Sequence, residues 1–132
     1  MLTLLQALEF QTRALKLAEI NQAEIAVAVV DSHGELVTFA KMDGAAFHAA
    51  KLAQNKAYTS ARDRQTTRNL ARWAQSTGKD LAYWTDDRFT GIAGGAPIEF
   101  EGAVIGAIGI SGMAEDDDEA LALEVLSHLN NL

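Results

Sequence analysis

Few side chains in this 132-residue chain have the chemistry of a catalytic or metal site. There is no cysteine, which excludes disulfides, thiolate nucleophiles and cysteine-ligated metals. The three histidines, His33, His48 and His128, show no pair at the spacing of metal ligands. His48 is the strongest candidate for a metal ligand, because it follows the segment MDGA at residues 42–45.

Asp43, Gly44 and Lys56 are the next candidates for contact with a ligand. Asp43 and Gly44 come just before a stretch with a helical pattern, so Asp43 can cap its first turn or line a pocket at the helix N-terminus. Lys56 lies on the same helix, off its alanine face, where it could reach an anionic ligand. The alternative is that Asp43 serves only as a cap and that Lys56 is simply solvated.

A glycine-rich stretch over residues 91–112 holds most of the chain's glycines and its only proline. Gly94, Gly95 and Pro97 form a turn at which a ligand could approach the backbone closely. Tight turn geometry explains the two glycines at least as well. The stretch lacks the G-x-G-x-x-G spacing and precedes no helix of a parallel β-α-β unit, which excludes a dinucleotide-binding loop.

An acidic run at residues 116–119 resembles a cluster of ligands for a hard cation. No EF-hand spacing surrounds it, and carboxylates at the start of a helix favour the helix dipole. We therefore expect these carboxylates to be solvated and to mark the first turn of the final helix.

The elements that position these residues follow from apolar periodicity and capping signals. Thr3 and Gln6 have capping-box spacing at the start of the first helix, whose Leu4, Leu8, Leu15 and Ala18 share one face. We expect helices over 3–21, 45–62 and 66–78, strands over 23–30, 36–40, 89–92, 97–100 and 103–110, and a helix from 116.

This order predicts an α+β domain with a five-stranded, mostly antiparallel sheet and flanking helices. The strands over 23–30 and 103–110 are apolar on both faces, so each is covered on both sides, by helices in three layers or by a partner subunit. The second helix offers an alanine face that can approach the sheet closely (Ala46, Ala50, Ala53, Ala57 and Ala61). In the last helix, Leu121, Val125 and Leu129 are expected to face the core.

Length and charge narrow the class of protein. A chain of 132 residues fits one domain over 1–132. A net charge of −7 without a basic run argues against nucleic acid as a partner. No apolar run approaches the roughly 20 residues that span a bilayer, and the N-terminal segment has no basic region of a signal peptide. We expect a soluble, cytoplasmic protein without a membrane partner.

Several short motifs together resemble the GlcG/HbpS-like haem-binding family. They are VVDSHG at 29–34, MDGA at 42–45, KAYT at 56–59, GGAPI at 94–98 and GAVIGAIGISG at 102–112. The resemblance covers roughly residues 5 to 130, and the chain also resembles the C-terminal domain of the propanediol-utilisation cobalamin adenosyltransferase. It implies a profilin-like, three-layer fold and assembly into homo-oligomers from dimers to octamers.

The resemblance also implies haem or a corrinoid as cofactor. We therefore predict an oligomeric protein, with an accessory or sensory role, that binds haem, a corrinoid or a similar planar or anionic small molecule. The predicted ligand-binding residues are Asp43, Gly44, Lys56, Gly94, Gly95 and Pro97, with His48 as a haem ligand. The alternative is an enzyme acting on a small hydroxy or keto acid, with Asp43 or Lys56 transferring a proton.

Overall fold

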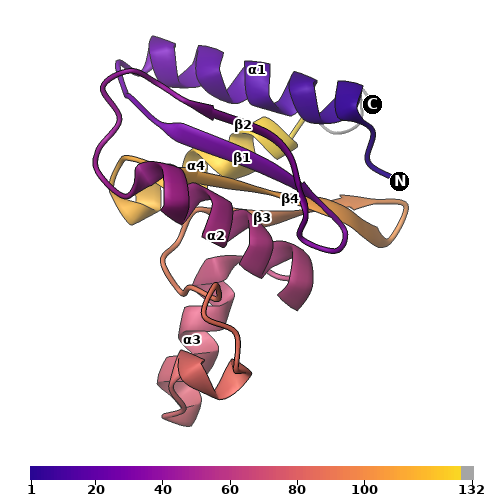
Figure 1. Cartoon of the computed structure of the whole chain (residues 1–132), viewed down its shortest axis with the longest axis vertical. Coiled ribbons are helices and arrows are strands. Elements are labelled where there is room, and N and C mark those ends of the chain that lie inside the picture. Colours follow the sequence, from indigo (N-terminus) through magenta and orange to yellow (C-terminus); the bar gives the residue numbers. More distant parts are fainter. Residues whose placement is uncertain (129–132) are drawn as a thin grey trace.

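The structure is a computed structural model and describes residues 1–128. In this part of the chain four α-helices, one short 3-10 helix and four strands follow one another (Figure 1). The helices are α1 (Leu4–Ile20), α2 (Ala49–Asp63), α3 (Thr67–Thr77) and α4 (Glu115–Leu126), and the 3-10 helix η1 is Leu81–Trp84. The strands are β1 (Ala26–Asp31), β2 (Leu36–Lys41), β3 (Gly95–Phe100) and β4 (Ala103–Ser111).

The four strands form one antiparallel sheet in the order β2-β1-β4-β3. Helices α1 and α4 cover one face of this sheet and α2 covers the other, while α3 and the segment after it project away from the body (Figure 1). The α+β class is thereby confirmed, and helices supply both outer layers. The prediction of five strands is wrong, because the described residues form four.

The strand expected over 89–92 does not form, because its backbone groups bond to side chains instead of to a neighbouring strand. Within the segment the Thr90 N–H donates to Oγ1 of Thr59 and the Ile92 N–H donates to Oγ1 of Thr90, and just after it the Ala93 N–H donates to a carboxylate oxygen of Glu115. The segment therefore crosses over α2 as an irregular strap, and β3 begins only at Gly95.

The core divides into two parts, one on each face of the sheet. On the α1 and α4 face, Val27 and Val29 of β1 pack with larger apolar side chains such as Phe10 and Ile108. On the α2 face every buried core residue except Val30 is an alanine, as with Ala28 of β1. Helices therefore cover both faces of β1, which accounts for its apolar residues on both faces.

Small residues let α2 lie directly against the sheet. Its Ala53, Ala57 and Ala61 are fully buried, which confirms most of the predicted alanine face. Opposite them, Gly109 of β4 leaves no room for a side chain, because a Cβ there would clash with the Ala53 carbonyl oxygen and lie 2.6 Å from the Ala57 nitrogen. Helix and strand thus touch backbone to backbone.

Helix α1 begins with the predicted capping box. The Gln6 N–H donates to Thr3 Oγ1 over 3.1 Å, and the Thr3 N–H donates to Gln6 Oε1 over 2.9 Å. Its buried face was predicted wrongly in part: Leu4 and Leu8 are exposed, and the fully buried residues are Ala7, Phe10, Ala14 and Ala18. The helix therefore carries a second, outward-facing apolar stripe.

The remaining helix signals agree with the structure at most positions. Thr66 caps α3 by accepting from the Asn69 N–H, and Gly78 ends the helix in the left-handed conformation. In α4, Leu121 and Val125 are buried as predicted, whereas Leu129 lies outside the described residues. Within residues 1–128, no helix combines the length and the apolar character that crossing a membrane requires.

Candidate functional site

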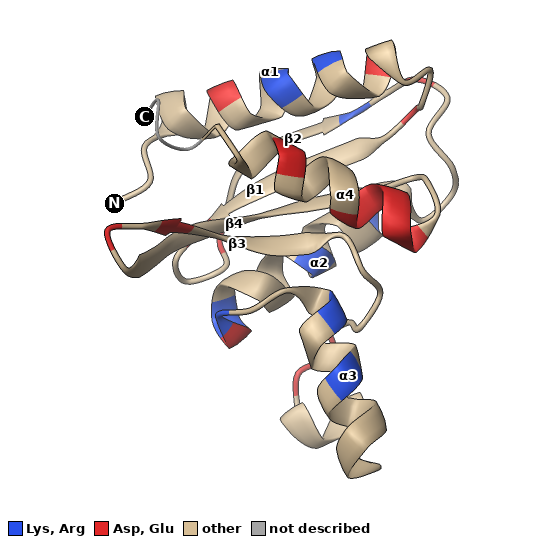
Figure 2. Cartoon of the chain, turned by 180° about the vertical axis from the view of Figure 1, so that it is seen from behind, with Lys and Arg blue, Asp and Glu red and all other residues tan. Residues whose placement is uncertain are grey.

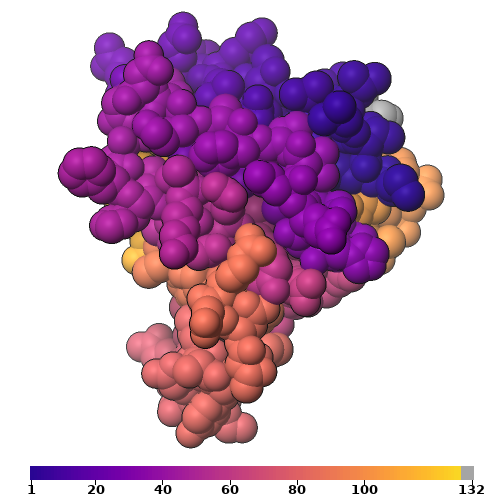
Figure 3. All heavy atoms as spheres, viewed as in Figure 1, coloured from indigo at the N-terminus to yellow at the C-terminus, as the bar shows by residue number. Residues whose placement is uncertain are grey.

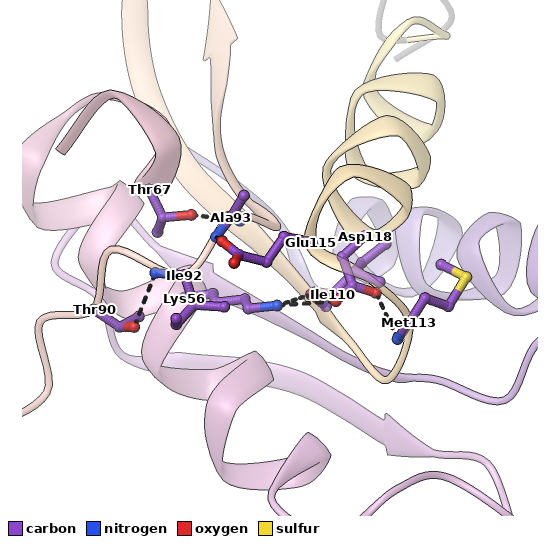
Figure 4. Close-up of polar contacts among 10 residues, drawn as sticks. Lys56, Thr67, Thr90, Ile92, Ala93, Ile110, Met113, Glu115 and Asp118 are labelled. Atoms are coloured by element: carbon purple, nitrogen blue, oxygen red, sulfur yellow. Dashed lines mark hydrogen bonds and ion pairs between the residues drawn. The ribbon is translucent and has the colours of Figure 1, made fainter. Parts of the chain in front are cut away.

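The predicted site residue Lys56 lies in the interior, between α2 and the start of α4 (Figure 4). Its Nζ donates to the Ile110 carbonyl oxygen over 2.8 Å and lies 3.1 Å from Oδ2 of Asp118. The other carboxylate oxygen of Asp118 accepts the Met113 N–H over 3.0 Å. Lys56 is therefore neither solvated nor free, and Asp118 is not the solvated carboxylate that was predicted.

Burial shapes the protonation of this pair. It lowers the pKa of the Lys56 ammonium, an effect that Asp118 and then Glu115 oppose. It likewise raises the pKa of the Asp118 carboxyl, which the charge and hydrogen bond of Lys56 oppose. Groups with such shifts occur both in active sites and in structural ion pairs. The side chains of Lys56 and Asp118 are 0% and 2% exposed, so in this arrangement neither can touch a ligand in solvent.

The glycine turn closes over the same ion pair. A Cβ at Gly94 would lie 2.7 Å from the Lys56 Nζ, and the residue adopts a φ of +133°, which favours glycine. The Gly95 N–H donates to Thr67 Oγ1 over 3.1 Å. The structure thus brings Lys56, Gly94 and Gly95 together in a sealed packing arrangement, and their contact with a ligand stays a prediction.

Pro97 lies further along β3, where it is partly buried and faces Ala107 of β4. Proline has no N–H to donate to a neighbouring strand, and β3 lies at the edge of the sheet, where proline is tolerated. Pro97 therefore has a sufficient structural role in the strand.

Asp43, Gly44 and His48 form a separate, exposed group in the loop before α2. The Gly44 N–H donates to the carboxylate of Glu24. Asp43 does not cap α2, and that prediction is wrong, because the helix begins at Ala49 and its N-cap is His48. His48 has a φ of +72°, a left-handed conformation that stops the helical pattern from continuing back toward Asp43.

His48 lines a small hollow of about 190 Å³ between this loop and the end of β4. Met113 and Leu52 line it as well. Phe47 also lines this hollow and is 92% exposed. The loop group and the interior group therefore do not enclose one cavity: the first faces solvent at this hollow, and the second is buried.

A larger hollow, of about 870 Å³, was not predicted from the sequence. It lies between the turn joining β1 to β2, one face of α2 and Arg88 of the loop before β3, and it includes His33, Tyr58 and Arg62. Tyr58 and Arg62 are four residues apart on α2 and therefore share a face, which is a local signal. Arg88 comes from the polar loop, and no spacing rule connects it to the other two.

Tyr58 anchors the wall of this hollow. Its hydroxyl donates to Oδ2 of Asp86 over 2.5 Å, and this hydrogen bond, followed by burial, raises the pKa of Tyr58. Burial alone would raise the pKa of Asp86, but the hydrogen bonds from Tyr58 and the Arg88 N–H, with the charges of Arg62 and Arg88, lower it overall.

The acidic run at the start of α4 is divided between several partners. Arg68 pairs with Glu119 over 2.9 Å and with Asp116, and Asp118 pairs with Lys56. Figure 2 shows these carboxylates gathered on the first turns of α4. No group of three or more His, Asp or Glu side chains within residues 1–128 is arranged to hold a metal ion. His128, the third histidine, is exposed after α4.

Comparison with known proteins gives matches along nearly the whole chain. The family model described as haem degrading protein HbpS-like matches residues 2–127. The protein GlcG of Escherichia coli K12 is 34% identical over 94 residues, which are 71% of this chain and 69% of GlcG.

Two solved structures extend the comparison to the fold. A double mutant of Streptomyces reticuli HbpS is 29% identical, with a TM-score of 0.88 over 97% of this chain and 86% of that one. A haem complex of PduOC is 25% identical, with a TM-score of 0.83 over 90% of this chain and 88% of that one.

Proposed function

The chain belongs to the HbpS-like family, and on that premise we propose that it is a haem-related small-molecule-binding protein with an accessory or sensory role. The observation that carries this proposal is the match to the family over residues 2–127. A related structure that contains haem supports it. Haem binding is the step that a carrier, a sensor and a haem-degrading protein have in common, so binding is what should be tested first.

The donor set at the His48 hollow fits a haem. His48 and Met113 line this one hollow, and histidine and methionine are both axial ligands of haem iron. No hydrogen bond ties the His48 ring to another group within residues 1–128, so its nitrogens are available. Phe47, at 92% exposure, offers an apolar surface to a macrocycle.

The size of this hollow restricts how the ligand would be held. Pockets that enclose a small molecule measure about 300–1,000 Å³, and this one measures about 190 Å³. The hollow is too small to enclose a macrocycle, so His48 would hold it through a ring nitrogen and Phe47 would offer it an apolar contact. Bound haem would supply redox or gas-binding chemistry, and His48 would equally suit a corrinoid as a nitrogen ligand. Asp43 and Gly44 belong to the same loop and complete the proposed surface.

Titration of the purified protein with haemin tests the proposal. We expect a saturable shift of the Soret band that weakens about tenfold or more in His48→Ala, because an axial ligand is lost. His33→Ala is the matched control, since His33 is an exposed histidine that does not line this hollow. No saturable shift in the parent protein would rule out haem, and an equal loss in both variants would rule out His48 as the ligand.

The enzymatic alternative has less support in the geometry. Asp43 is exposed in a loop, whereas Lys56 is sealed against Asp118. The two groups proposed for proton transfer therefore do not face one substrate. A thermal-shift screen with 2-hydroxy and 2-keto acids would revive this alternative if those acids stabilised the protein and haemin did not.

The outward stripe of α1 supports the proposal that the protein forms homo-oligomers. A shallow hollow of about 690 Å³ runs along this helix, and Leu5 and Ile20 at its two ends are 74% and 75% exposed. The residues that line it are symmetric about the midpoint between Thr12 and Arg13. The symmetric pairs are Leu5 with Ile20, Leu8 with Leu17, Glu9 with Lys16, and Thr12 with Arg13.

This symmetry is what a two-fold interface between identical helices requires. If α1 of a second copy lay antiparallel on the first, Glu9 of each copy would face Lys16 of the other, and the apolar residues would meet apolar residues. We therefore propose α1 as the dimer interface on which larger assemblies would be built.

A further inference from the structure

The larger hollow gathers positive charge in a protein that is otherwise acidic. Lys51, Arg62 and Arg88 line it, and Glu35 is the carboxylate among the lining residues. The chain as a whole carries a net charge of −7. The β1–β2 turn, α2 and the loop before β3, which supply these residues, meet on the face seen in Figure 3. A concave surface of this charge would concentrate anions locally.

Each arginine is held by one nitrogen and keeps the others free. Nε of Arg62 donates to the His33 carbonyl oxygen over 3.0 Å, and Nε of Arg88 lies 3.4 Å from Oδ1 of Asn55. Within residues 1–128 neither guanidinium has a further hydrogen bond or an ion pair. The guanidinium of Arg68, in contrast, is paired with two carboxylates. Free terminal nitrogens of this kind can grip a carboxylate or phosphate in bidentate fashion.

Tyr58 gives the two guanidinium groups a fixed platform. The Cζ atoms of Arg88 and Arg62 lie 3.8 Å and 4.9 Å from the centre of its ring. The ring is itself fixed, because its hydroxyl donates to Asp86 and it packs edge-to-face with Phe89. Asp86 is the nearby carboxylate that could compete for the arginines, and it is already occupied by Tyr58 and by the Arg88 N–H.

We propose that this hollow binds a small organic dianion, with one carboxylate or phosphate group held by Arg62 and Arg88. Lys51 lies seven residues before Tyr58 on α2, which is about 10 Å along the helix axis. It is placed for a second acidic group at the other end of the molecule. Leu36 and Ala50 line the hollow as well and provide an apolar surface for the part between. A volume of about 870 Å³ suits a ligand of this size.

This inference does not depend on haem. The His48 hollow and the Arg62–Arg88 hollow have no lining residue in common. Either proposal can therefore fail while the other stands, provided that haemin and the anions are titrated separately.

The test is calorimetric titration of the full chain with inorganic phosphate and with succinate, at constant ionic strength set by sodium chloride. Tryptophan emission gives a second readout, because Trp84 packs on Phe89, which contacts Tyr58. We expect saturable binding of at least one anion that weakens about tenfold in Arg88→Gln and in Arg62→Gln, since each removes a charged hydrogen-bond donor. Arg72→Gln removes an exposed arginine outside the hollow and should bind like the parent.

The outcomes separate the sources of the anion. Binding of phosphate alone indicates a phosphate ester, binding of succinate alone indicates a dicarboxylate, and binding of both indicates recognition of the oxyanion itself. Arg88→Lys keeps the charge but loses the planar fork, so its affinity should fall between parent and Arg88→Gln. The proposal is overturned if neither anion saturates the parent protein, or if Arg72→Gln loses as much affinity as the variants in the hollow.

Discussion

Lys56 and Asp118 show how a residue's role depends on a partner far along the chain. The two are 62 positions apart in sequence, and both are buried. Lys56 was predicted from its place on the helix, but its partner was hidden inside an acidic run that resembled a solvated helix start. A sequence pattern reports the face of an element, and it cannot report which charge on another element reaches that face.

Removing one member of this pair should be costly. Asp118→Asn leaves the Lys56 ammonium buried without a countercharge, and Lys56→Met leaves the Asp118 carboxylate in the same position. We expect either change to lower the free energy of unfolding by about 3–5 kcal/mol. Urea denaturation followed by circular dichroism measures the loss. Asp117→Asn, next to it and exposed, is the control and should change stability little.

The double variant Lys56→Met with Asp118→Leu separates charge from packing. If the buried charges are the cause, the double variant should recover to within about 1 kcal/mol of the parent protein, because an apolar pair needs no solvation. If the double variant instead lost as much free energy of unfolding as the two single variants together, packing and not charge would explain the destabilisation.

At the scale of elements, local sequence signals predicted where helices begin and end, but they did not predict which segments pair as strands. The caps at Thr3, Thr66 and Gly78 depend on neighbours within a few residues and were predicted correctly. The segment over 89–92 had the apolar character of a strand but no strand beside it, so the side chains of Thr59 and Thr90 accept N–H groups of this segment. Strand pairing is a property of two segments, and one segment's pattern cannot establish it.

The same limit affects the candidate site. The turn at Gly94 and Gly95 lies against Lys56, but a ligand contact of these residues stays a prediction. Asp43 was placed wrongly, because the left-handed backbone of His48 delays the start of α2 until Ala49. Arg88 was missed because an irregular loop carries no periodicity.

The contact between α2 and β4 should tolerate no added methyl group at Gly109. A Cβ there would meet backbone atoms of Ala53 and Ala57, which cannot move aside as a side chain can. We expect Gly109→Ala to lower the melting temperature, with a loss of about 1–3 kcal/mol in the free energy of unfolding.

Gly44→Ala is the matched control for this substitution. The atoms that a Cβ at Gly44 would meet belong to the flexible carboxylate of Glu24, so its effect should be smaller. Differential scanning calorimetry of both variants decides the matter. Equal destabilisation would mean that backbone contact with α2 is not what requires glycine at Gly109.

At the scale of the whole molecule, the sequence indicated three layers but left open what covers the sheet. Strand β1 has apolar residues on both faces, and the structure shows that α2 and the α1–α4 pair cover them within one chain. One stretch of apolar surface that remains uncovered lies along α1, where Leu5, Leu8 and Ile20 are exposed. In our proposal the outer face of α1 therefore forms the oligomer interface, and the sheet needs no partner subunit to cover either of its faces.

A charge exchange on α1 tests this interface. Glu9→Lys or Lys16→Glu alone would place like charges opposite each other twice in the two-fold pair, so each should shift the protein toward monomer. The double variant Glu9→Lys with Lys16→Glu restores opposite charges and should restore assembly. Light scattering across a range of concentrations measures the mass.

The double variant also serves as the control for non-specific charge effects, since its net charge equals that of the parent protein. A monomeric parent protein at micromolar concentration would contradict assembly as a whole. An oligomer whose mass none of these variants changes would place the interface elsewhere on the molecule.

The ion pair between Lys56 and Asp118 has a further consequence for how the domain unfolds. It joins α2, on one face of the sheet, to α4, on the other, past the end of β4. If either helix detached alone, a charge would be left without its partner in the interior, and that intermediate would be raised in free energy. The pair therefore acts against partly open states and makes the two faces of the domain a single cooperative unit.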